Sequence, residues 1–498
     1  MAKRLLTSAV AVSALLIGCS TPGSVGGVSS ANAAQNEVRY LTDEEKKIGR
    51  EAHPQLMQEF GGAYDSPQAA YVERIGKDIA SYSGLGNARE EFTVTLLNSP
   101  VNNAFAVPGG YIYITRQLMA LMNDEAELAG VLGHEVGHID ARHSQRRQRA
   151  AKRNNILGVL GQIGSAILLG DSAFGRLGQE LFGRGSQLLT LSYSRGQEHE
   201  ADDLGVLYLD RAGYDTQAVS TMLYSLALQN ALEKRARGQT GRSVPSWAST
   251  HPDSAKRVRR SAKKAAKTEH SGTGKRNREA FLQQLDGLLY GDDPEQGVVQ
   301  GNRFVHPTLG FAFNTPNGYS VNNGSRAVTV QGQGGQAQFS LAPYSNDLNA
   351  YVRSVFDALA KDNNRLPYGE IGRTTINGMP MAFSTARVNN GRQTVDVSVY
   401  AYEYSSDRAY HFVTITPAGR NNPFGQMIGS FAKVSGDEAS SVRAKRIDVI
   451  TVGQGDTVAS LAAKMPFDNY QEERFRTLNG LANDARLTPG QKVKTVTF

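Results

Sequence analysis

Two histidines with a glutamate between them are the residues of this chain whose spacing most directly suggests chemistry. They lie in the segment Val131-Leu-Gly-His134-Glu135-Val-Gly-His138. Residues at i and i+4 share one face of an α-helix, so His134 and His138 can bind the same metal ion. Glu135 occupies the adjacent position, from which its carboxylate can reach a water molecule at the metal. The pattern is typical of zinc-dependent peptide hydrolysis, although it also arises by chance in ordinary surface helices.

A zinc site in a hydrolase usually has three protein ligands and one open position. Further along the chain, Glu198 and Asp202 are spaced i, i+4, so they share a helix face. We predict that Glu198 is the third ligand and that Asp202 accepts a hydrogen bond from a ligand imidazole, which fixes the tautomer of that ring. By itself, such an acidic helical turn is usually a solvated surface.

Three polar neighbours of these motifs are predicted to lie outside the site. His143 is at i+5 from His138, which is a poorer ligand spacing, so we expect a surface or structural residue. His199 and Glu200 are expected to face away from the metal.

These segments together resemble the gluzincin zinc metallopeptidases of the BepA, LoiP, HtpX and Oma type. The resemblance covers about Val38 to Tyr290 and rests on four linked elements: Asn103–Gly110, Glu127–Gly133, His134-Glu135-x-x-His138, and Ser194-Arg195 followed by Glu198-x-x-x-Asp202. It implies one Zn²⁺ ion held by His134, His138 and Glu198, with Glu135 moving the proton of the attacking water to the leaving amine.

The resemblance also assigns roles to two residues and one strand. Thr250-His251-Pro252, with Arg257 six residues after His251, matches the family's histidine-proline element. It implies that His251 either stabilises the oxyanion or plugs the open metal position, and that Arg257 lies near the substrate. Tyr111 to Ile114 resembles the edge strand that binds extended substrate by main-chain hydrogen bonds, which would suit unfolded or misassembled polypeptides.

The N-terminus resembles a bacterial lipoprotein signal. Lys3-Arg4 and a short apolar run precede Leu16-Ile17-Gly18-Cys19, which contains the only cysteine. This implies lipid attachment at Cys19 and, because Ser20 follows, anchoring in the outer membrane facing the periplasm of a Gram-negative bacterium. The alternative is a secretory signal cut after Ala31-Asn-Ala33. With a single cysteine, an intramolecular disulfide is excluded.

Length and charge narrow the class of protein. The chain has 498 residues, which predicts two to four domains, and its 40% apolar content permits packed cores. Much of the net charge of +7 gathers between Lys256 and Arg278 without interleaved aromatic residues. We expect a solvated helix face or contact with anionic lipid or lipopolysaccharide, and no nucleic acid partner.

We predict a multidomain α+β chain. Its parts are a signal peptide (1–18), a flexible tether (19–37), a mainly helical metallopeptidase domain (38–292), a small antiparallel α+β interaction domain (300–436) and a LysM-like βααβ module (445–498). Within the metallopeptidase domain we expect a capped helix start at Thr42, strands at 92–97 and 111–114, and a last helix at 281–290. The apolar stretch 156–170 is expected to be a lid over the site, a surface that touches the membrane, or a buried helix.

The C-terminal segment resembles a LysM module through Gly453-Gln-Gly-Asp-Thr457 and Pro489-Gly-Gln491. The resemblance implies binding to N-acetylglucosamine chains of peptidoglycan. The segment Met465 to Arg474 departs from the usual spacing, so a degenerate lid or spacer stays open as an alternative.

The leading hypothesis is a cell-envelope zinc endopeptidase that degrades misfolded outer-membrane or periplasmic proteins. The alternatives are an assembly chaperone that works with the outer-membrane assembly machinery and has an autoinhibited protease site, and a peptidoglycan-associated anchor protein.

Overall fold

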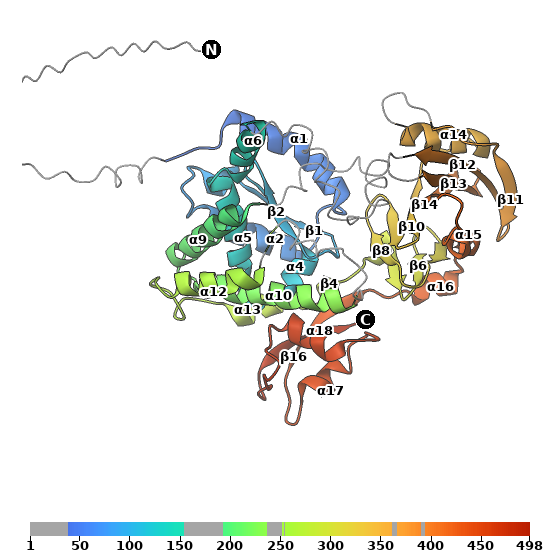
Figure 1. The fold of residues 1–498 in the computed structure, drawn as a ribbon. Coiled ribbons are helices and arrows are strands. Elements are labelled where there is room, and N and C mark those ends of the chain that lie inside the picture. The colour runs from blue at the N-terminus through green and yellow to red at the C-terminus, as the bar shows by residue number, and fades with distance from the viewer. Residues whose placement is uncertain (1–37, 154–192, 237–250, 253, 361–365, 390–393) are drawn as a thin grey trace, which may run out of the picture. The chain divides into compact units, whose positions relative to one another are not determined.

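The computed structural model describes residues 38–153, 193–236, 251–252, 254–360, 366–389 and 394–498. The predicted signal, the tether with Cys19 and the apolar stretch 156–170 lie outside these residues. The described part is a mixture of helices and sheets, as expected (Figure 1). Within these described ranges, no helix combines the length and the apolar character needed to cross a bilayer.

A small sheet forms the N-terminal part of the region from 43 to 290. It follows helices α1 (Asp43–Glu59), α2 (Pro67–Ala80) and α3 (Ala88–Glu91). Thr42 begins α1 with a reciprocal capping box to Glu45, as the sequence predicted. The strand order is β1-β3-β2, where the strands are β1 (Thr93–Leu97), β2 (Ala104–Val107) and β3 (Tyr111–Thr115).

The prediction that Tyr111 to Ile114 is the edge strand is wrong. Strand β3 pairs in parallel with β1 and antiparallel with β2, so it is the central strand and β2 lies at the edge. A tight turn joins β2 to β3, so β2 pairs antiparallel with the side of β3 that β1 leaves free. Strand β2 therefore takes the edge position that was predicted for β3. Gly109 makes this turn at φ +92°, and a Cβ there would lie 2.5 Å from the Glu45 carbonyl oxygen.

Helix α5 (Glu125–Asp140) is the centre of this region, and all 16 of its residues are buried. Helix α9 (Arg195–Arg211) crosses it closely because small residues face each other. A Cβ on Gly137 would lie 3.2 Å from the carbonyl oxygen of Ala201, and one on Gly205 would lie 3.4 Å from the backbone nitrogen of His134. The glycines therefore let the two helices approach at the turns that carry the predicted ligands.

Other helices surround this pair. They are α4 (Arg116–Leu121), α6 (His143–Arg153), α10 (Ala218–Ala236), α12 (Ser254–Ala265) and α13 (Arg278–Leu285). The predicted last helix at 281–290 is too long. Helix α13 ends at Leu285, and Leu289–Tyr290 instead form strand β4, because their main chain pairs with a distant strand of the C-terminal segment.

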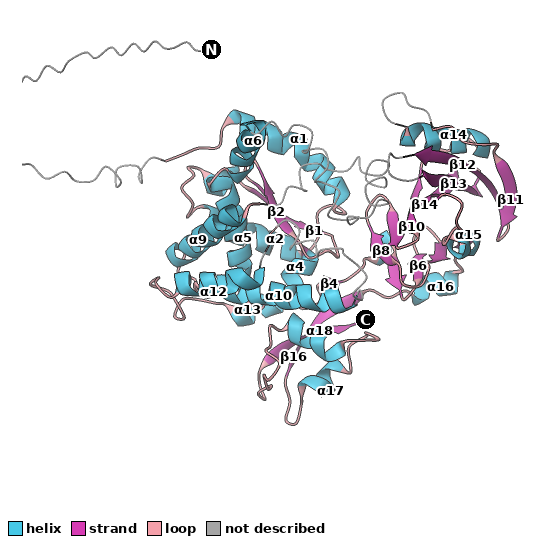
Figure 2. Cartoon of the chain, viewed as in Figure 1, coloured by secondary structure: helices cyan, strands magenta, loops and turns pink. Residues whose placement is uncertain are grey.

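The region from 298 to 433 consists of two antiparallel sheets and one long helix (Figure 2). The larger sheet has the order β11-β12-β13-β14-β10-β9-β8, and α14 (Leu348–Leu359) packs against it. Its strands are β8 (Ser320–Asn323), β9 (Val328–Gly332), β10 (Gly335–Leu341), β11 (Gly372–Ile376), β12 (Met379–Asn389), β13 (Thr394–Ser405) and β14 (Arg408–Pro417). The smaller sheet is β15-β7-β6-β5, from β5 (Val298–Gln300), β6 (Arg303–His306), β7 (Phe311–Asn314) and β15 (Ala432–Lys433). Short helices lie just before this region at Pro294–Gln296 (η2), within it at Gly425–Ser430 (α15) and just after it at Gly436–Ser441 (α16).

The C-terminal segment forms the predicted β-α-α-β arrangement from β16 (Lys445–Thr451), α17 (Val458–Ala462), α18 (Gln471–Leu478) and β17 (Lys492–Thr497). It is joined to the region from 43 to 290, because β4 pairs with β16 and the apolar residues of both segments form one cluster. Lys494 is fully buried and donates to the carbonyl oxygens of Ala120 (2.8 Å) and Met122 (2.5 Å). The segment is therefore built into the core rather than attached by a free linker.

Candidate metal centre

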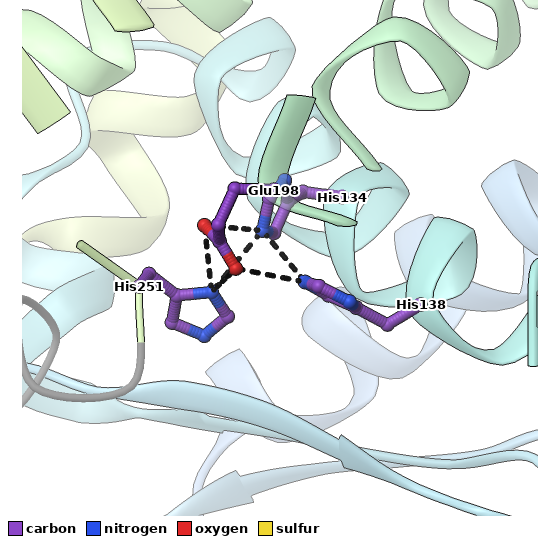
Figure 3. Close-up of side chains that lie close together, drawn as sticks. All are labelled: His134, His138, Glu198 and His251. Carbon is purple, nitrogen blue, oxygen red and sulfur yellow. Dashed lines mark hydrogen bonds and ion pairs between the residues drawn. The ribbon is translucent and has the colours of Figure 1, made fainter. Parts of the chain in front are cut away.

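The three predicted ligands meet at one point. His134 and His138 lie one turn apart on α5, and their Nε2 atoms are 3.0 Å apart. Glu198, from the first turn of α9, places Oε2 3.7 Å from Nε2 of His134 and Oε1 3.5 Å from Nε2 of His138 (Figure 3). Ligand atoms bound to one tetrahedral zinc at about 2.1 Å lie roughly 3.4 Å from each other. The two imidazole nitrogens and the carboxylate oxygen therefore fit a zinc ion in both chemistry and spacing.

His251 belongs to the same cluster. Its Nδ1 is 3.2 Å from Nε2 of His134 and 3.1 Å from Oε1 of Glu198. Ligand atoms of the four residues His134, His138, Glu198 and His251 all lie within 4.8 Å of one another. Burial opposes a charge on His251, but the carboxylates of Glu198 and Glu135 outweigh it, so the pKa of His251 is raised.

Asp202 lies where the sequence predicted, beside a ligand imidazole. Its Oδ1 is 3.1 Å from Nδ1 of His134. A carboxylate there keeps the proton on Nδ1 and leaves Nε2 to bind metal. Burial opposes ionisation of Asp202, but Arg257 and the contact with His134 outweigh it and lower its pKa.

Arg257 faces the acids rather than the substrate side. Its side chain is 1% exposed, and it donates to Asp202 from Nε (2.8 Å) and Nη2 (2.6 Å) and to Glu198 from Nη1. Although burial of Glu198 favours its neutral form, the charges of His251 and Arg257 lower its pKa. Arg257 therefore keeps both acids ionised, as a metal ligand and its neighbour require.

Glu135 lies fully buried at the edge of the cluster. Its Oε1 is 3.5 Å from Nε2 of His251, and neither carboxylate oxygen accepts a hydrogen bond from the residues that the structure describes. Burial raises the pKa of Glu135, which a bound dication would offset. A buried carboxylate with spare acceptor capacity beside the ligands is suited to take a proton from water.

Two neighbours of His138, Tyr193 and His143, were not identified from the sequence as part of the site. The Tyr193 ring stacks on the His138 ring at 3.7 Å between centroids, and burial raises the pKa of Tyr193 to about 12. His143, for which a surface position was one expectation, is fully buried, with Nδ1 2.8 Å from Nδ1 of His138. The i+5 spacing from His138 argues against His143 as a metal ligand. However, a ligand imidazole usually has a hydrogen-bond partner on its other ring nitrogen, and this rule could have identified His143 from the sequence.

His199 and Glu200 lie on the other sides of α9 from Glu198. Glu200 is an acceptor for His143 Nε2 (3.1 Å) and Arg146 (2.8 Å), so it contacts the surroundings of the site but not the cluster itself. The carbonyl oxygen of His199 accepts from Arg260.

A small pocket adjoins the site. Its lining includes Ala106 and Val107 of edge strand β2, Pro108 after that strand, and His138 and Tyr193. An extended chain that pairs with β2 would therefore pass beside the ligands.

The geometry brings together buried histidines and a carboxylate that could hold a metal ion, with a second buried carboxylate, Glu135, beside them. Residues 66–265 match the peptidase family M48 model, and residues 450–495 match the LysM domain model. The chain thus carries a metallopeptidase domain of family M48 followed by a LysM domain, and the predicted family resemblance is confirmed.

Three metalloproteases are similar to part of this chain. The mitochondrial metalloendopeptidase OMA1 of Schizosaccharomyces pombe is 32% identical over 222 residues, which are 44% of this chain and 60% of that protein. The beta-barrel assembly-enhancing protease of Yersinia pestis is 32% identical over 168 residues, 34% of each chain. The metalloprotease YcaL of Escherichia coli is 28% identical over 235 residues, 45% of this chain and 86% of that protein. The chain therefore spans less than two thirds of the first two relatives.

Proposed function

We propose that this protein is a zinc-dependent endopeptidase of the bacterial cell envelope that acts on misfolded or misassembled periplasmic and outer-membrane proteins. The observation that carries the proposal is the meeting of His134, His138 and Glu198 beside the buried carboxylate of Glu135. The relative named a beta-barrel assembly-enhancing protease supports a substrate among β-barrel proteins.

In this proposal the side chains divide the work of peptide hydrolysis. Zinc, when bound by His134, His138 and Glu198, polarises the scissile carbonyl and acidifies water. Glu135 removes the proton from the attacking water and delivers it to the leaving amine. The main chain of β2 aligns the substrate, which demands little of its sequence. Arg257 keeps Glu198 and Asp202 ionised, so we assign it a positioning role instead of direct contact with substrate.

A second function is favoured by the place of His251. Its Nδ1 lies within 3.2 Å of a His134 ligand atom, so His251 could occupy the open coordination position. The protein would then be an autoinhibited protease that serves mainly as an assembly chaperone beside the outer-membrane assembly machinery. The alternative for His251 is to donate to the oxyanion during hydrolysis.

The proposed location and partners rest on the termini. The lipobox supports cleavage before Cys19, acylation of that residue and anchoring in the outer membrane facing the periplasm. The LysM match supports peptidoglycan as a partner, because the turns at Gln454-Gly455 and Pro489-Gly490 are exposed. We retain the division into 38–292, 300–436 and 445–498 as functional parts, with the second as an interaction domain.

The experiment that tests the proposal compares the full-length protein with Glu135→Gln. Elemental analysis should find one zinc per chain in both proteins. Casein digestion by Glu135→Gln should fall by a factor of about 10² to 10⁴, because the general base is lost while the ligands remain. Glu44→Gln, an exposed position on α1, is the matched control and should keep full activity.

The same variant separates the two functions in cells. If proteolysis is the main function, Glu135→Gln should fail to restore outer-membrane integrity to a deletion strain, whereas a chaperone would restore part of it. A native protein without zinc, or Glu135→Gln that digests casein at the native rate, would contradict the enzyme proposal.

A further inference from the structure

We propose that His143 is a positioning residue for the zinc site: it holds the ligand His138 through a relay of hydrogen bonds that ends at Glu200. The inference deepens the proposed function, because it rests on a metal bound by Nε2 of His138. It assigns a role in metal binding to a residue outside the HExxH helix and outside the ligand set.

The backbone delivers His143 to this place by an unusual turn. Helix α5 ends at Asp140, and Arg142 adopts a left-handed conformation at φ +51° before α6 begins at His143. Positive φ is uncommon for a residue with a side chain, so surrounding contacts must hold it. The Arg142 guanidinium donates to Glu45 Oε1 (2.8 Å) and to the carbonyl oxygen of Tyr40 (2.9 Å).

The distances leave one consistent arrangement of protons. If Nε2 of His138 faces the metal, its Nδ1 carries the hydrogen and donates to Nδ1 of His143, 2.8 Å away. His143 then carries its own hydrogen on Nε2 and donates it to Glu200 Oε2, 3.1 Å away. Glu200 also accepts a hydrogen bond from Arg146 at 2.8 Å, so the carboxylate at the end of the relay forms an ion pair with a guanidinium group.

The two ligand histidines therefore use different outer partners. His134 donates directly to a buried carboxylate, Asp202. His138 reaches its carboxylate only through the ring of His143, and that carboxylate, Glu200, is 43% exposed. Outer partners of this kind fix the tautomer and orientation of a ligand ring, and removing one typically weakens metal binding by a factor of about 10 to 100.

The experiment measures zinc affinity of full-length variants by chelator competition and the visible spectrum of the cobalt-substituted proteins. We expect His143→Ala to bind zinc about 10 to 100 times more weakly and to shift the cobalt bands, because the His138 ring loses its acceptor. His143→Asn should recover most of the affinity, since its amide oxygen can replace Nδ1 as the acceptor. His143→Gln should not, because its amide extends toward the position of Nε2.

Two further variants test the end of the relay and provide a control outside the site. Glu200→Gln changes a partly exposed side chain at the end of the relay, so it should fold and weaken zinc binding to a smaller extent. His270→Ala removes a histidine that pairs with Asp210 at 3.0 Å outside the site, and it should leave affinity and spectrum unchanged.

The relay is overturned if His143→Ala and Glu200→Gln bind zinc as tightly as the native protein and His270→Ala, with unchanged cobalt bands. Failure of the native protein to bind zinc would instead overturn the proposed function itself, so the two failures are distinguishable.

Discussion

The metal centre and the sheet region from 298 to 433 both bury histidines, but in opposite surroundings. His134 and His138 face two carboxylates and each other across 3.0 Å. His411 on β14 is 6% exposed, and both of its ring nitrogens face hydroxyl groups, at 3.1 Å from Ser340 Oγ and 2.9 Å from Tyr351 Oη. A buried imidazole is therefore not evidence of a site, whereas several ligand atoms that converge on one point are.

The two regions also differ in the charge state of their buried groups. Buried acids and Arg257 stay ionised together at the metal centre, because each offsets the desolvation of the other. Around His411 nothing offsets desolvation, and burial lowers its pKa to about 4. The first arrangement can bind a cation, and the second can only be satisfied as a neutral part of the core.

The largest expected difference between the two regions comes from replacing one buried histidine of each region with alanine. His138→Ala should weaken zinc binding by more than the factor of about 100 that marks loss of an outer partner, and casein digestion should fall to background. His411→Ala should keep one zinc and full activity, but lose about 1–3 kcal/mol of unfolding free energy, because the Ser340 hydroxyl loses its imidazole partner and Tyr351 keeps only its main-chain partners. Zinc analysis and urea unfolding of both variants measure this.

If His411→Ala lost its zinc while staying folded, the two regions would be coupled and the contrast would fail. Equal melting temperatures for metal-free His138→Ala and the metal-free native protein would support it, since His138 then contributes to stability mainly through the ion.

A second, smaller effect concerns the spacing of helices. At Gly137 an added Cβ meets the Ala201 carbonyl oxygen at 3.2 Å, whereas at Gly429 on α15 it meets no atom within 4 Å. Gly137→Ala should therefore destabilise by about 1 kcal/mol, because overpacking exceeds the gain in helix propensity, and it should weaken zinc binding by moving α9. Chemical unfolding and chelator competition measure both effects.

The matched control is Gly429→Ala, which should stabilise slightly because only the propensity gain remains. Unchanged zinc affinity in Gly137→Ala would show that the approach of α5 and α9 is not what places Glu198.

The smallest expected effect concerns the pH dependence of stability, which tests the different charge states of the buried groups in the two regions. The unfolded chain protonates His411 near pH 6.5, but the folded protein does so only near pH 4, so the unfolded state binds more protons between these values. Stability should fall as pH drops through this window, and His411 should account for about 2 kcal/mol between pH 7 and pH 5. His411→Gln should remove that part of the slope in thermal melts. A variant with the native pH dependence would contradict the assignment.

Local patterns predicted the elements well. The capped helix start at Thr42 and the strands at 92–97 and 111–114 all lie close to their predicted places, because each depends on neighbouring residues. The predicted last helix failed at Leu289–Tyr290, where pairing with β16 outweighs the helical spacing. The edge strand was misplaced because strand order depends on how β2 folds back, which spacing along the chain does not contain.

The sequence alone determined which residues could form the metal centre, because ligand type and the i, i+4 spacing are local properties of a helix. Tertiary structure decided the rest: the approach of α5 and α9 through their glycines, the left-handed turn at Arg142 that puts His143 behind His138, and the union of the LysM segment with the peptidase core through Lys494. Each of these joins residues far apart in the chain or depends on a backbone turn held by distant contacts. Such features depend on packing, which residue order specifies only through the whole fold.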